Sequence, residues 1–326
     1  MAVDSVGNVF IAEYMNHRIR KVTASTGIIT TIAGIGTAGS GGDGSAATNA
    51  QLLNPSEVSV DSVGNIFIAD YTNNRIRKVT ASTGVITTIA GTGAAGSGGD
   101  GSAATNARLL NPTGVSVDSV GNVVIADTHN NRIRKINVST GVITTIAGTG
   151  TEGSGGDGSA ATIAQLHVPT KLAVDSVGNI FIADYANNRI RKINASTGDI
   201  TTIAGNGTAG SGGDGSAATN AQLLNPTGVS VDSVGNIFIA DTHNHRIRKI
   251  NASTGVITAI AGTGTAGSGG DGSAATFAML NNPTAVSVDS VGNVFIADYT
   301  NNRIRKISSG NDALTHSESN SLLAQY

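Results

Sequence analysis

The sequence predicts an all-β protein with the architecture of a six-bladed β-propeller, and three observations support this fold class. The block Val-Asp-Ser-Val-Gly-Asn recurs at a constant interval of 57 residues, with its aspartate at Asp4, Asp61, Asp118, Asp175, Asp232 and Asp289. Each period contains four short segments of β-type residues separated by turn residues. The second of these segments is apolar on both faces, so it must be covered by a sheet on each side, as in a propeller.

The four segments are clearest in the second copy of the repeat. They span Val58–Asp61, Asn65–Ala69, Arg75–Val79 and Val85–Ala90. The links between them have three to five residues, which is too short for a crossover helix, so neighbouring strands must be antiparallel. In the second segment Ile66 and Ile68 point to one face and Phe67 and Ala69 to the other. Each period therefore predicts one four-stranded antiparallel sheet, or blade.

An open solenoid is the alternative architecture, but it needs atypical polar capping repeats, and the first and sixth copies resemble the interior ones. The sixth copy lacks the segment Thr-Gly-Val-Ile-Thr-Thr-Ile-Ala-Gly and has only residues 313–316 as a weak substitute. We therefore expect a sixth blade with a degenerate or missing outer strand. The propeller is expected over residues 1–307 and a loosely ordered polar tail over residues 308–326. A piece of a longer repeat protein is an alternative interpretation.

Composition excludes several classes of protein. There are 20 Lys and Arg against 22 Asp and Glu, giving a net charge of −2, so no net field draws the chain to nucleic acid or anionic lipid. The absence of cysteine excludes disulfides, thiolate nucleophiles and Cys-ligated zinc. Neither a secretory signal nor a membrane-spanning segment is expected. The sequence therefore indicates a soluble protein and leaves its compartment open.

One known family resembles these repeats. The run Asn225-Pro226-Thr227-Gly228, continuing to Asp241 and then Asn244-His245-Arg246-Ile247-Arg248-Lys249, is similar to the NHL repeat, and the similarity recurs in all six copies. The family is named after an Asn-His-Leu triplet. Two copies here have Asn-His-Arg-Ile and the other four have Asn-Asn-Arg-Ile. The resemblance covers residues 1 to about 307 and implies the NHL-repeat propeller fold.

Charged residues follow the repeat closely. Eighteen of the 20 basic residues lie in six Arg-Ile-Arg-Lys runs. One interpretation is that these runs form an RNA-binding surface, which the resemblance allows. The other is that they form ion pairs within the repeat, with Arg75 and its equivalents contacting Asp70 and its equivalents across the second link. Each complete repeat carries three acids and three bases, which favours internal pairing. The Gly-Ser-Gly-Gly-Asp-Gly-Ser loop fits the spacing of an anion nest or a calcium site poorly. We expect instead that its aspartate, such as Asp43, caps the backbone of its own loop.

Candidate binding residues collect at one end of the predicted blades. Because strand direction alternates, the link between the second and third strands lies at the same end as the long loop between blades. The copies differ in chemistry mostly at this long-loop end. The residues expected to form a ligand-binding face are Glu57, Tyr71, His129, Lys171, Tyr185, His243 and Tyr299.

The most consistent functional hypothesis is a non-enzymatic, monomeric binding scaffold that presents its long-loop face to a protein, peptide or glycan. We expect no cofactor and no metal. Neither a membrane nor a nucleic acid is expected as a partner. We assign no catalytic residues, because a catalytic site needs distinct side chains converging on one point, whereas the first strands are nearly uniform. The resemblance leaves two alternatives open. One is a channel-site metalloenzyme similar to peptidylglycine amidating lyase or gluconolactonase-like hydrolases, and the other is an RNA-binding NHL propeller.

Overall fold

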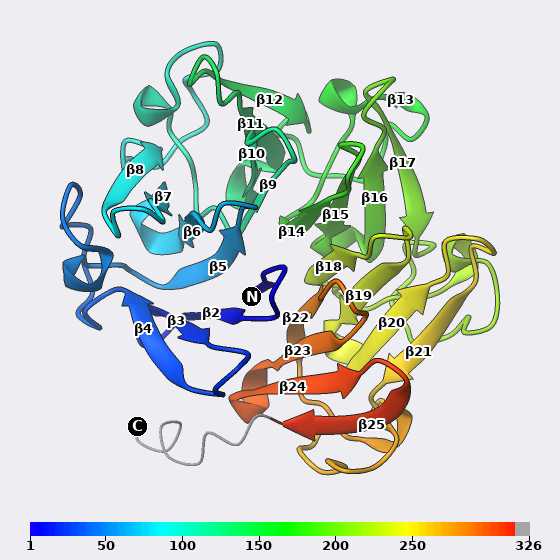
Figure 1. Cartoon of the computed structure of the whole chain (residues 1–326). Helices are drawn as coiled ribbons and strands as arrows, with labels where there is room; N and C mark the ends of the chain where they lie inside the picture. Colours follow the sequence, from blue (N-terminus) through cyan, green and yellow to red (C-terminus); the bar gives the residue numbers. More distant parts are fainter. Residues whose placement is uncertain (317–326) are drawn as a thin grey trace. The chain divides into compact units, whose positions relative to one another are not determined.

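The computed structural model describes residues 1–316, and its strands form six sheets (Figure 1). The fold is the predicted six-bladed β-propeller, with one antiparallel blade for each repeat. The chain divides into two compact units, Met1–Ile182 with Lys192–Thr201 and Ala183–Arg191 with Thr202–Tyr326. The helices of residues 1–316 have three residues each, and none has the length or apolar character needed to cross a membrane.

The strands of each blade follow one another in chain order. The first three blades are β1 (Ala2–Val3), β2 (Val9–Glu13), β3 (Arg18–Val22) and β4 (Ile29–Ala33); β5 (Pro55–Val60), β6 (Ile66–Asp70), β7 (Arg75–Val79) and β8 (Ile86–Ala90); and β9 (Gly114–Val117), β10 (Val123–Asp127), β11 (Arg132–Ile136) and β12 (Ile143–Ala147). The other three are β14 (Pro169–Val174), β15 (Ile180–Asp184), β16 (Arg189–Ile193) and β17 (Asp199–Ala204), with β13 (Ser159–Ala160) at the edge; β18 (Gly228–Val231), β19 (Ile237–Asp241), β20 (Arg246–Ile250) and β21 (Ile257–Ala261); and β22 (Pro283–Val288), β23 (Val294–Asp298), β24 (Arg303–Ser308) and β25 (Asn311–His316).

Short 3-10 helices occur at two places in the repeat. One set lies in the long loops: η1 (Ala47–Asn49), η3 (Ala104–Asn106), η5 (Ala161–Ile163), η7 (Ala218–Asn220) and η9 (Ala275–Phe277). The other set forms the link between the second and third strands: η2 (Tyr71–Asn73), η4 (Thr128–Asn130), η6 (Tyr185–Asn187), η8 (Thr242–Asn244) and η10 (Tyr299–Asn301). The second set lies at the long-loop end of the blades, whereas the first set contacts the links between third and fourth strands, as the Ala47 N–H donates to the carbonyl of Gly84.

The sixth blade has a complete outer strand, so the expectation of a degenerate or missing one was wrong. β25 pairs with β24 through Ile307 and Leu314. Leu314 is fully buried, and its backbone bonds to Gly272 and Ser273 as Ile86 bonds to Gly44 and Ser45 in the second blade. One buried leucine is sufficient because the other side chains of an outer strand need not be apolar. The predicted loose tail falls mainly on residues 317–326, which lie outside the described residues.

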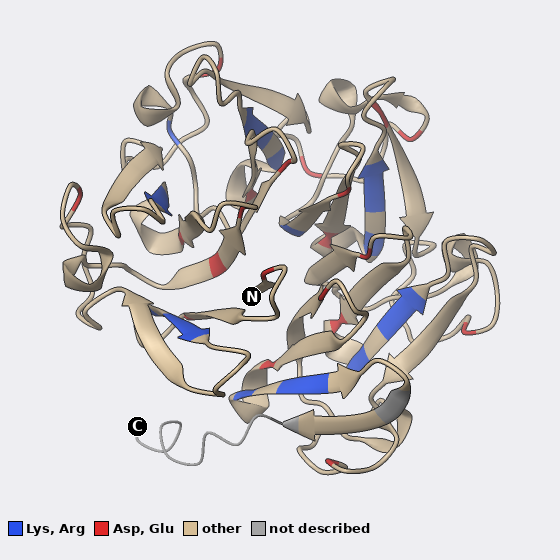
Figure 2. Ribbon diagram, viewed as in Figure 1, with Lys and Arg blue, Asp and Glu red and all other residues tan. Residues whose placement is uncertain are grey.

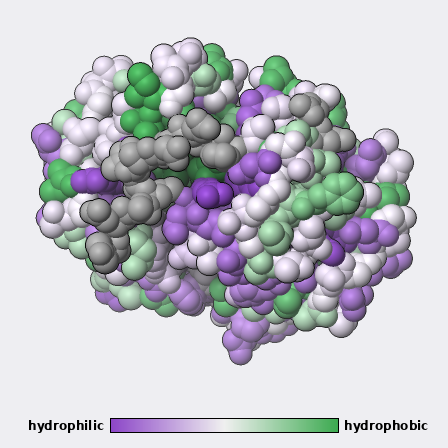
Figure 3. Space-filling model, turned by 90° about the horizontal axis from the view of Figure 1, so that it is seen from below, coloured by the Kyte–Doolittle hydropathy of each residue, from purple (hydrophilic) through white to green (hydrophobic). Residues whose placement is uncertain are grey.

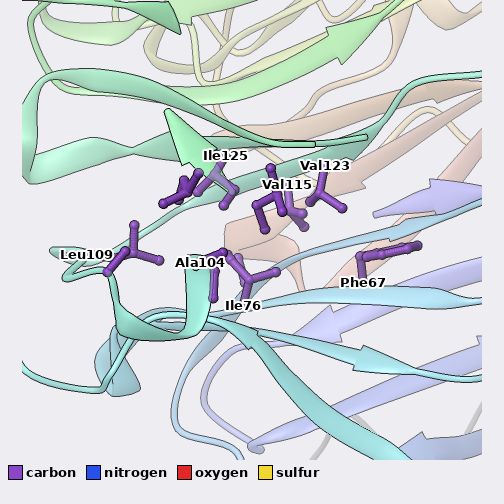
Figure 4. Close-up of a cluster of buried hydrophobic side chains, with 12 residues drawn as sticks. Phe67, Ile76, Ala104, Leu109, Val115, Val123 and Ile125 are labelled. Carbon is purple, nitrogen blue, oxygen red and sulfur yellow. The ribbon is translucent and has the colours of Figure 1, made fainter. Parts of the chain in front are cut away.

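The second strand of a blade is buried on both faces, as its apolar pattern predicts. In β6, Ile66 and Ile68 pack in a cluster that includes residues of the first blade, such as Phe10 and Ile19. On the opposite face, Phe67 belongs to a cluster with residues of β9 and β10 (Figure 4). Successive blades of the first unit therefore share one apolar layer at each junction.

The repeated arginines are the main correction to the sequence analysis. The basic residues lie mostly on the third strands (Figure 2), and the second arginine of the run is fully buried in five blades, as Arg77, Arg134, Arg191, Arg248 and Arg305. In the third blade, Arg134 contacts Asp127 Oδ2 at 3.2 Å through Nη1, and its Nε donates to Asp100 Oδ1 at 2.9 Å. Asp127 belongs to β10, and Asp100 comes from the long loop that leads into the blade. The buried arginine therefore fastens this loop to the sheet.

The first arginine, which was expected to pair with the aspartate, has a different role. Arg75 donates to the backbone carbonyls of Ser40 and Thr92, whereas Asp70 pairs with Arg77. The loop aspartate Asp43 was expected to cap its own backbone, but it accepts hydrogen bonds from Arg77 and Thr88. Charged residues are thus paired internally, as the charge balance indicated, but the partners differ from the predicted ones.

Burial of the strand aspartates affects their ionisation. Removal from water raises the pKa of Asp127, although hydrogen bonds from the Leu110 backbone, Asn130 and Arg134 act in the opposite direction. The same balance raises the pKa of Asp70 and Asp241. A buried ion pair of this kind contributes to stability only while both partners are present.

We expect Asp127→Ala to lower the free energy of unfolding by about 3–5 kcal/mol, because it leaves the Arg134 guanidinium buried beside an empty position. Asp100→Ala is the matched control. The Asp100 side chain is 44% exposed, so water can replace it and the loss should be about 1 kcal/mol. Urea unfolding of both variants measures the difference. Equal losses would contradict the importance of the buried partner.

Candidate ligand-binding site at the long-loop end

The links between second and third strands place aromatic side chains at the long-loop end. In the second blade, Tyr71 begins η2, and the link closes with Asn74 in the left-handed conformation at φ 52°. The aspartate before the link anchors it, because Asp70 Oδ2 accepts a hydrogen bond from Asn73 Nδ2 at 2.8 Å, and Asp70 Oδ1 accepts the backbone N–H of Leu53 in the long loop at 2.8 Å. The same aspartate therefore holds the buried arginine and supports the link that carries the aromatic residue.

Three successive blades of the first unit form an aromatic row, which we define as Tyr14, Tyr71 and His129. The ring centroids of Tyr14 and Tyr71 are 5.8 Å apart, and those of Tyr71 and His129 are 6.3 Å apart in an edge-to-face arrangement. Such separations are typical of aromatic contacts. Tyr14 and Tyr71 are half-buried and His129 is exposed. The row therefore offers a stiff, partly apolar strip to a ligand.

The second unit contains a shorter version of this arrangement. The rings of Tyr185 and His243 are 6.3 Å apart and nearly perpendicular. His243 Nδ1 also lies 2.9 Å from Asn225 Oδ1, and burial, followed by the nearby His243, lowers the pKa of His245. Tyr299 is 53% exposed. The five predicted aromatic site residues are thus all placed on these links.

The two charged candidates, Glu57 and Lys171, are paired with each other. Lys171 Nζ lies 3.2 Å from Glu57 Oε2, and the Met1 amino nitrogen donates to Glu57 Oε1 at 2.6 Å. Glu57 is in β5 and Lys171 is in β14, on either side of β9. Between them, a Cβ on Gly114 would lie 2.4 Å from the carbonyl oxygen of Thr170, so only glycine permits this approach of β9 to β14. Glu57 is buried, so its carboxylate is paired inside the protein with Lys171 and the Met1 amino group.

Sequence reasoning missed the asparagines that hold the aromatic links. Asn111 adopts φ 48°, its N–H donates to Asn74 Oδ1 at 2.8 Å, and its side chain donates to the carbonyl of Tyr71 at 3.4 Å. Asn54 donates to the carbonyl of Tyr14 in the same way. The signal was the recurrent Asn-Pro dipeptide, which lies at or just before the first strand in four of the copies. Asparagine tolerates the left-handed region, so this dipeptide marks the bridge between neighbouring blades.

Within residues 1–316, the structure contains no group of three or more His, Cys, Asp or Glu side chains placed to hold a metal ion.

One copy departs from the asparagine pattern. Val168 occupies the corresponding position with φ 53°, and its N–H donates to Asn131 Oδ1 at 2.9 Å. A β-branched residue in the left-handed region is strained. The junction between the third and fourth blades therefore carries a conformational cost beside the link that presents His129.

We expect Val168→Asn to raise the free energy of unfolding by about 1 kcal/mol, because it relieves left-handed strain. The new side chain could also donate to the carbonyl of Thr128, as Asn111 donates to that of Tyr71. The matched control is Asn111→Val, which should be destabilising by about 1–2 kcal/mol. Denaturant unfolding of both variants checks the opposite signs, and a destabilised Val168→Asn variant would contradict the assignment of strain.

Comparison with known proteins agrees with the fold. The sequence model of the family described as "Teneurin NHL domain" matches residues 36–98, 93–155 and 206–269, and that described as "NHL repeat" matches residues 280–307. Protein SUPPRESSOR OF QUENCHING 1, chloroplastic, from Arabidopsis thaliana is 29% identical over 76% of the chain and 24% of its own length. NHL repeat-containing protein 2 from Gallus gallus is 26% identical over 94% of the chain and 45% of its own length.

Solved structures show the same architecture. A catalytically inactive virginiamycin B lyase from Staphylococcus aureus, with quinupristin, has a TM-score of 0.56 and 17% identity, covering 96% of the chain and 81% of that structure. At this level of identity the similarity concerns the fold alone. The chain spans less than half the length of the two curated relatives described above.

Proposed function

The chain belongs to the NHL-repeat β-propeller family, and on that premise we propose that it is a non-enzymatic binding scaffold. The long-loop end of its blades would bind a protein, peptide or glycan. The observation that carries this proposal is the aromatic row Tyr14, Tyr71 and His129, whose rings contact one another across three successive blades. Aromatic side chains contribute a large contact area at low entropic cost, which is why they dominate binding surfaces.

The distribution of charge supports a contact through rings and amides. Five of the six second arginines of the repeat are fully buried, for example Arg134 and Arg248 against aspartates. First arginines such as Arg132 donate to loop carbonyls. An RNA-binding surface would need these cations to reach phosphates. Glu57 and Lys171 are likewise paired together, and Glu152 of a long loop is paired with His167.

Exposed apolar residues at the other end of the blades provide a control surface. Val63 and Val177 belong to the first links and are 73% and 72% exposed. On the face shown in Figure 3, hydrophobic and hydrophilic residues are interspersed. A substitution such as Val63→Ser therefore changes surface hydropathy without touching the aromatic row.

The proposal predicts that a ligand found on peptide or glycan arrays loses affinity when the aromatic row is removed. The variant Tyr71→Ala/His129→Ala should bind about 30-fold more weakly, as expected for the loss of a central aromatic anchor. Val63→Ser should bind like the unmodified protein. Isothermal titration calorimetry measures all three proteins.

Two results would count against the scaffold. Equal affinity of the double variant and the unmodified protein would remove the long-loop end as the binding surface. Stoichiometric metal in the purified protein, lost together with an enzymatic activity on chelation, would favour the metalloenzyme alternative.

A further inference from the structure

A hydrogen bond of one kind recurs at five blade junctions of residues 1–316. A backbone N–H at the start of one blade donates to the side chain of the residue that closes the second link of the preceding blade. At three junctions the acceptor is an asparagine oxygen at 2.8–2.9 Å, with the pairs Asn111 to Asn74, Val168 to Asn131 and Asn225 to Asn188. At the other two junctions the acceptor is a histidine Nδ1 at 3.1 Å, with the pairs Asn54 to His17 and Asn282 to His245.

The two histidines replace an acceptor that does not titrate by one that does. An imidazole nitrogen accepts a hydrogen bond only while it is unprotonated, so the ring that accepts at Nδ1 carries its single proton on Nε2. When Nδ1 also takes a proton, it becomes a donor that faces the N–H of the neighbouring asparagine. Acid therefore breaks the bond at the histidine junctions and leaves the asparagine junctions unchanged.

Asn54 connects the first of these bonds to the aromatic row. Its Nδ2 donates to the carbonyl of Tyr14 at 3.2 Å, and its Oδ1 accepts a hydrogen bond from Thr72 Oγ1 at 3.0 Å. Thr72 follows Tyr71 in η2, so Asn54 bonds to both links whose rings are 5.8 Å apart. The bond from Asn54 to His17 therefore helps to fix the separation of these two rings.

The surroundings of His245 favour the neutral ring. Burial lowers the pKa of His245, and the nearby His243 adds to this effect, whereas Asp298 of the sixth blade acts in the opposite direction. The unfolded chain therefore takes up a proton at this histidine more readily than the folded protein. The contribution to stability is fully present above the ordinary histidine pKa of about 6.5, and it is lost as the pH falls from there through the lowered pKa of the folded state.

The other charged groups around the two histidines are already engaged. The acids at the ends of the neighbouring second strands are paired with arginines, as Glu13 with Arg20, Asp70 with Arg77, Asp241 with Arg248 and Asp298 with Arg305. The arginines that follow the histidines, Arg18 and Arg246, donate to loop carbonyls. Met15 takes the place of His243 at the first junction. Among these groups, every carboxylate has an arginine partner that competes with a protonated ring.

We propose that His17 and His245 are positioning residues that make their two junctions sensitive to acid. At neutral pH His17 holds Asn54 between the links of Tyr14 and Tyr71. Protonation of His17 releases Asn54, and the two rings of the aromatic row separate. The consequence for ligand binding rests on the proposed scaffold function, whereas the change at the junctions does not.

NMR spectroscopy of the unliganded protein tests the junctions directly. Between about pH 7.5 and about pH 5, we expect the amide signals of Asn54 and Asn282 to titrate. Asn111 and Asn225 are the matched internal controls, because their N–H groups donate to asparagine oxygens and their signals should stay constant. Four amides that titrate alike, or four that stay constant, would overturn the proposal.

Variants of His17 separate positioning from simple packing. The readout is the nuclear Overhauser effect between the rings of Tyr14 and Tyr71, which should be present at about pH 7.5 and lost at about pH 5. His17→Asn installs the acceptor of the other copies, so the ring contact should persist at both pH values. His17→Gly keeps the left-handed turn but removes the acceptor, so the contact should be absent at both. A folded His17→Asn protein that still loses the contact in acid would contradict the role of His17.

The second junction gives an independent measurement of stability. Urea unfolding of the unmodified protein should show a midpoint that decreases from about pH 7.5 to about pH 5, and the decrease should be smaller in His245→Asn. Identical decreases in both proteins would overturn the assignment of His245. Loss of the ring contact in acid, combined with an array ligand whose affinity does not depend on the aromatic row, would support the acid-sensitive junctions and reject the scaffold surface.

Discussion

The structure depends on a buried arginine held between two aspartates from different parts of one repeat. Arg134 is fully enclosed, and it joins Asp127 of the second strand to Asp100 of the incoming long loop. Removing a guanidinium from water is costly, so the contact persists only when its geometry is satisfied from both sides. The same aspartate that receives the arginine also anchors the backbone of Leu110. Sheet, loop and aromatic link are therefore fixed by one cluster of charges.

This arrangement determines which side chains remain for recognition. Most repeated charges neutralise one another inside a blade or donate to loop carbonyls, so the copies present similar surfaces except where single residues change. The changes that alter chemistry include tyrosine or histidine on the second link, Glu57 and Lys171 on either side of Gly114, and Val124 where the other five second strands have phenylalanine. In the long loops they include Arg108, Glu152 and His167. A rigid repeated frame with a few individual substitutions is well suited to binding, because the frame holds those substitutions at fixed spacing.

The repeat made the architecture predictable, whereas contacts within it depended on details that periodicity does not contain. The interval of 57 residues and the two-faced apolar strand at Ile66–Asp70 were sufficient for the blades. Arg75 and Arg77 lie on the same face of one strand, so spacing alone could not decide which meets Asp70. Asp43 is 34 residues from Arg77 in the sequence, and Glu57 meets Lys171 two repeats away only because Gly114 lies between them. The aromatic links were located correctly because link length and strand direction determine the end of the blade.

A chain of nearly identical repeats contains its own controls, and this helps to interpret the junction of the third and fourth blades. Val168 accepts a left-handed backbone where the second, third, fifth and sixth copies have asparagine, and Val124 replaces the phenylalanine of the other five copies. Each departure should lower stability relative to the repeat's usual residue. One lies beside the link that carries His129, and the other lies near the start of the second strand, opposite Lys135. Both costs thus fall at one junction, and the other copies supply the reference residue against which each cost can be measured.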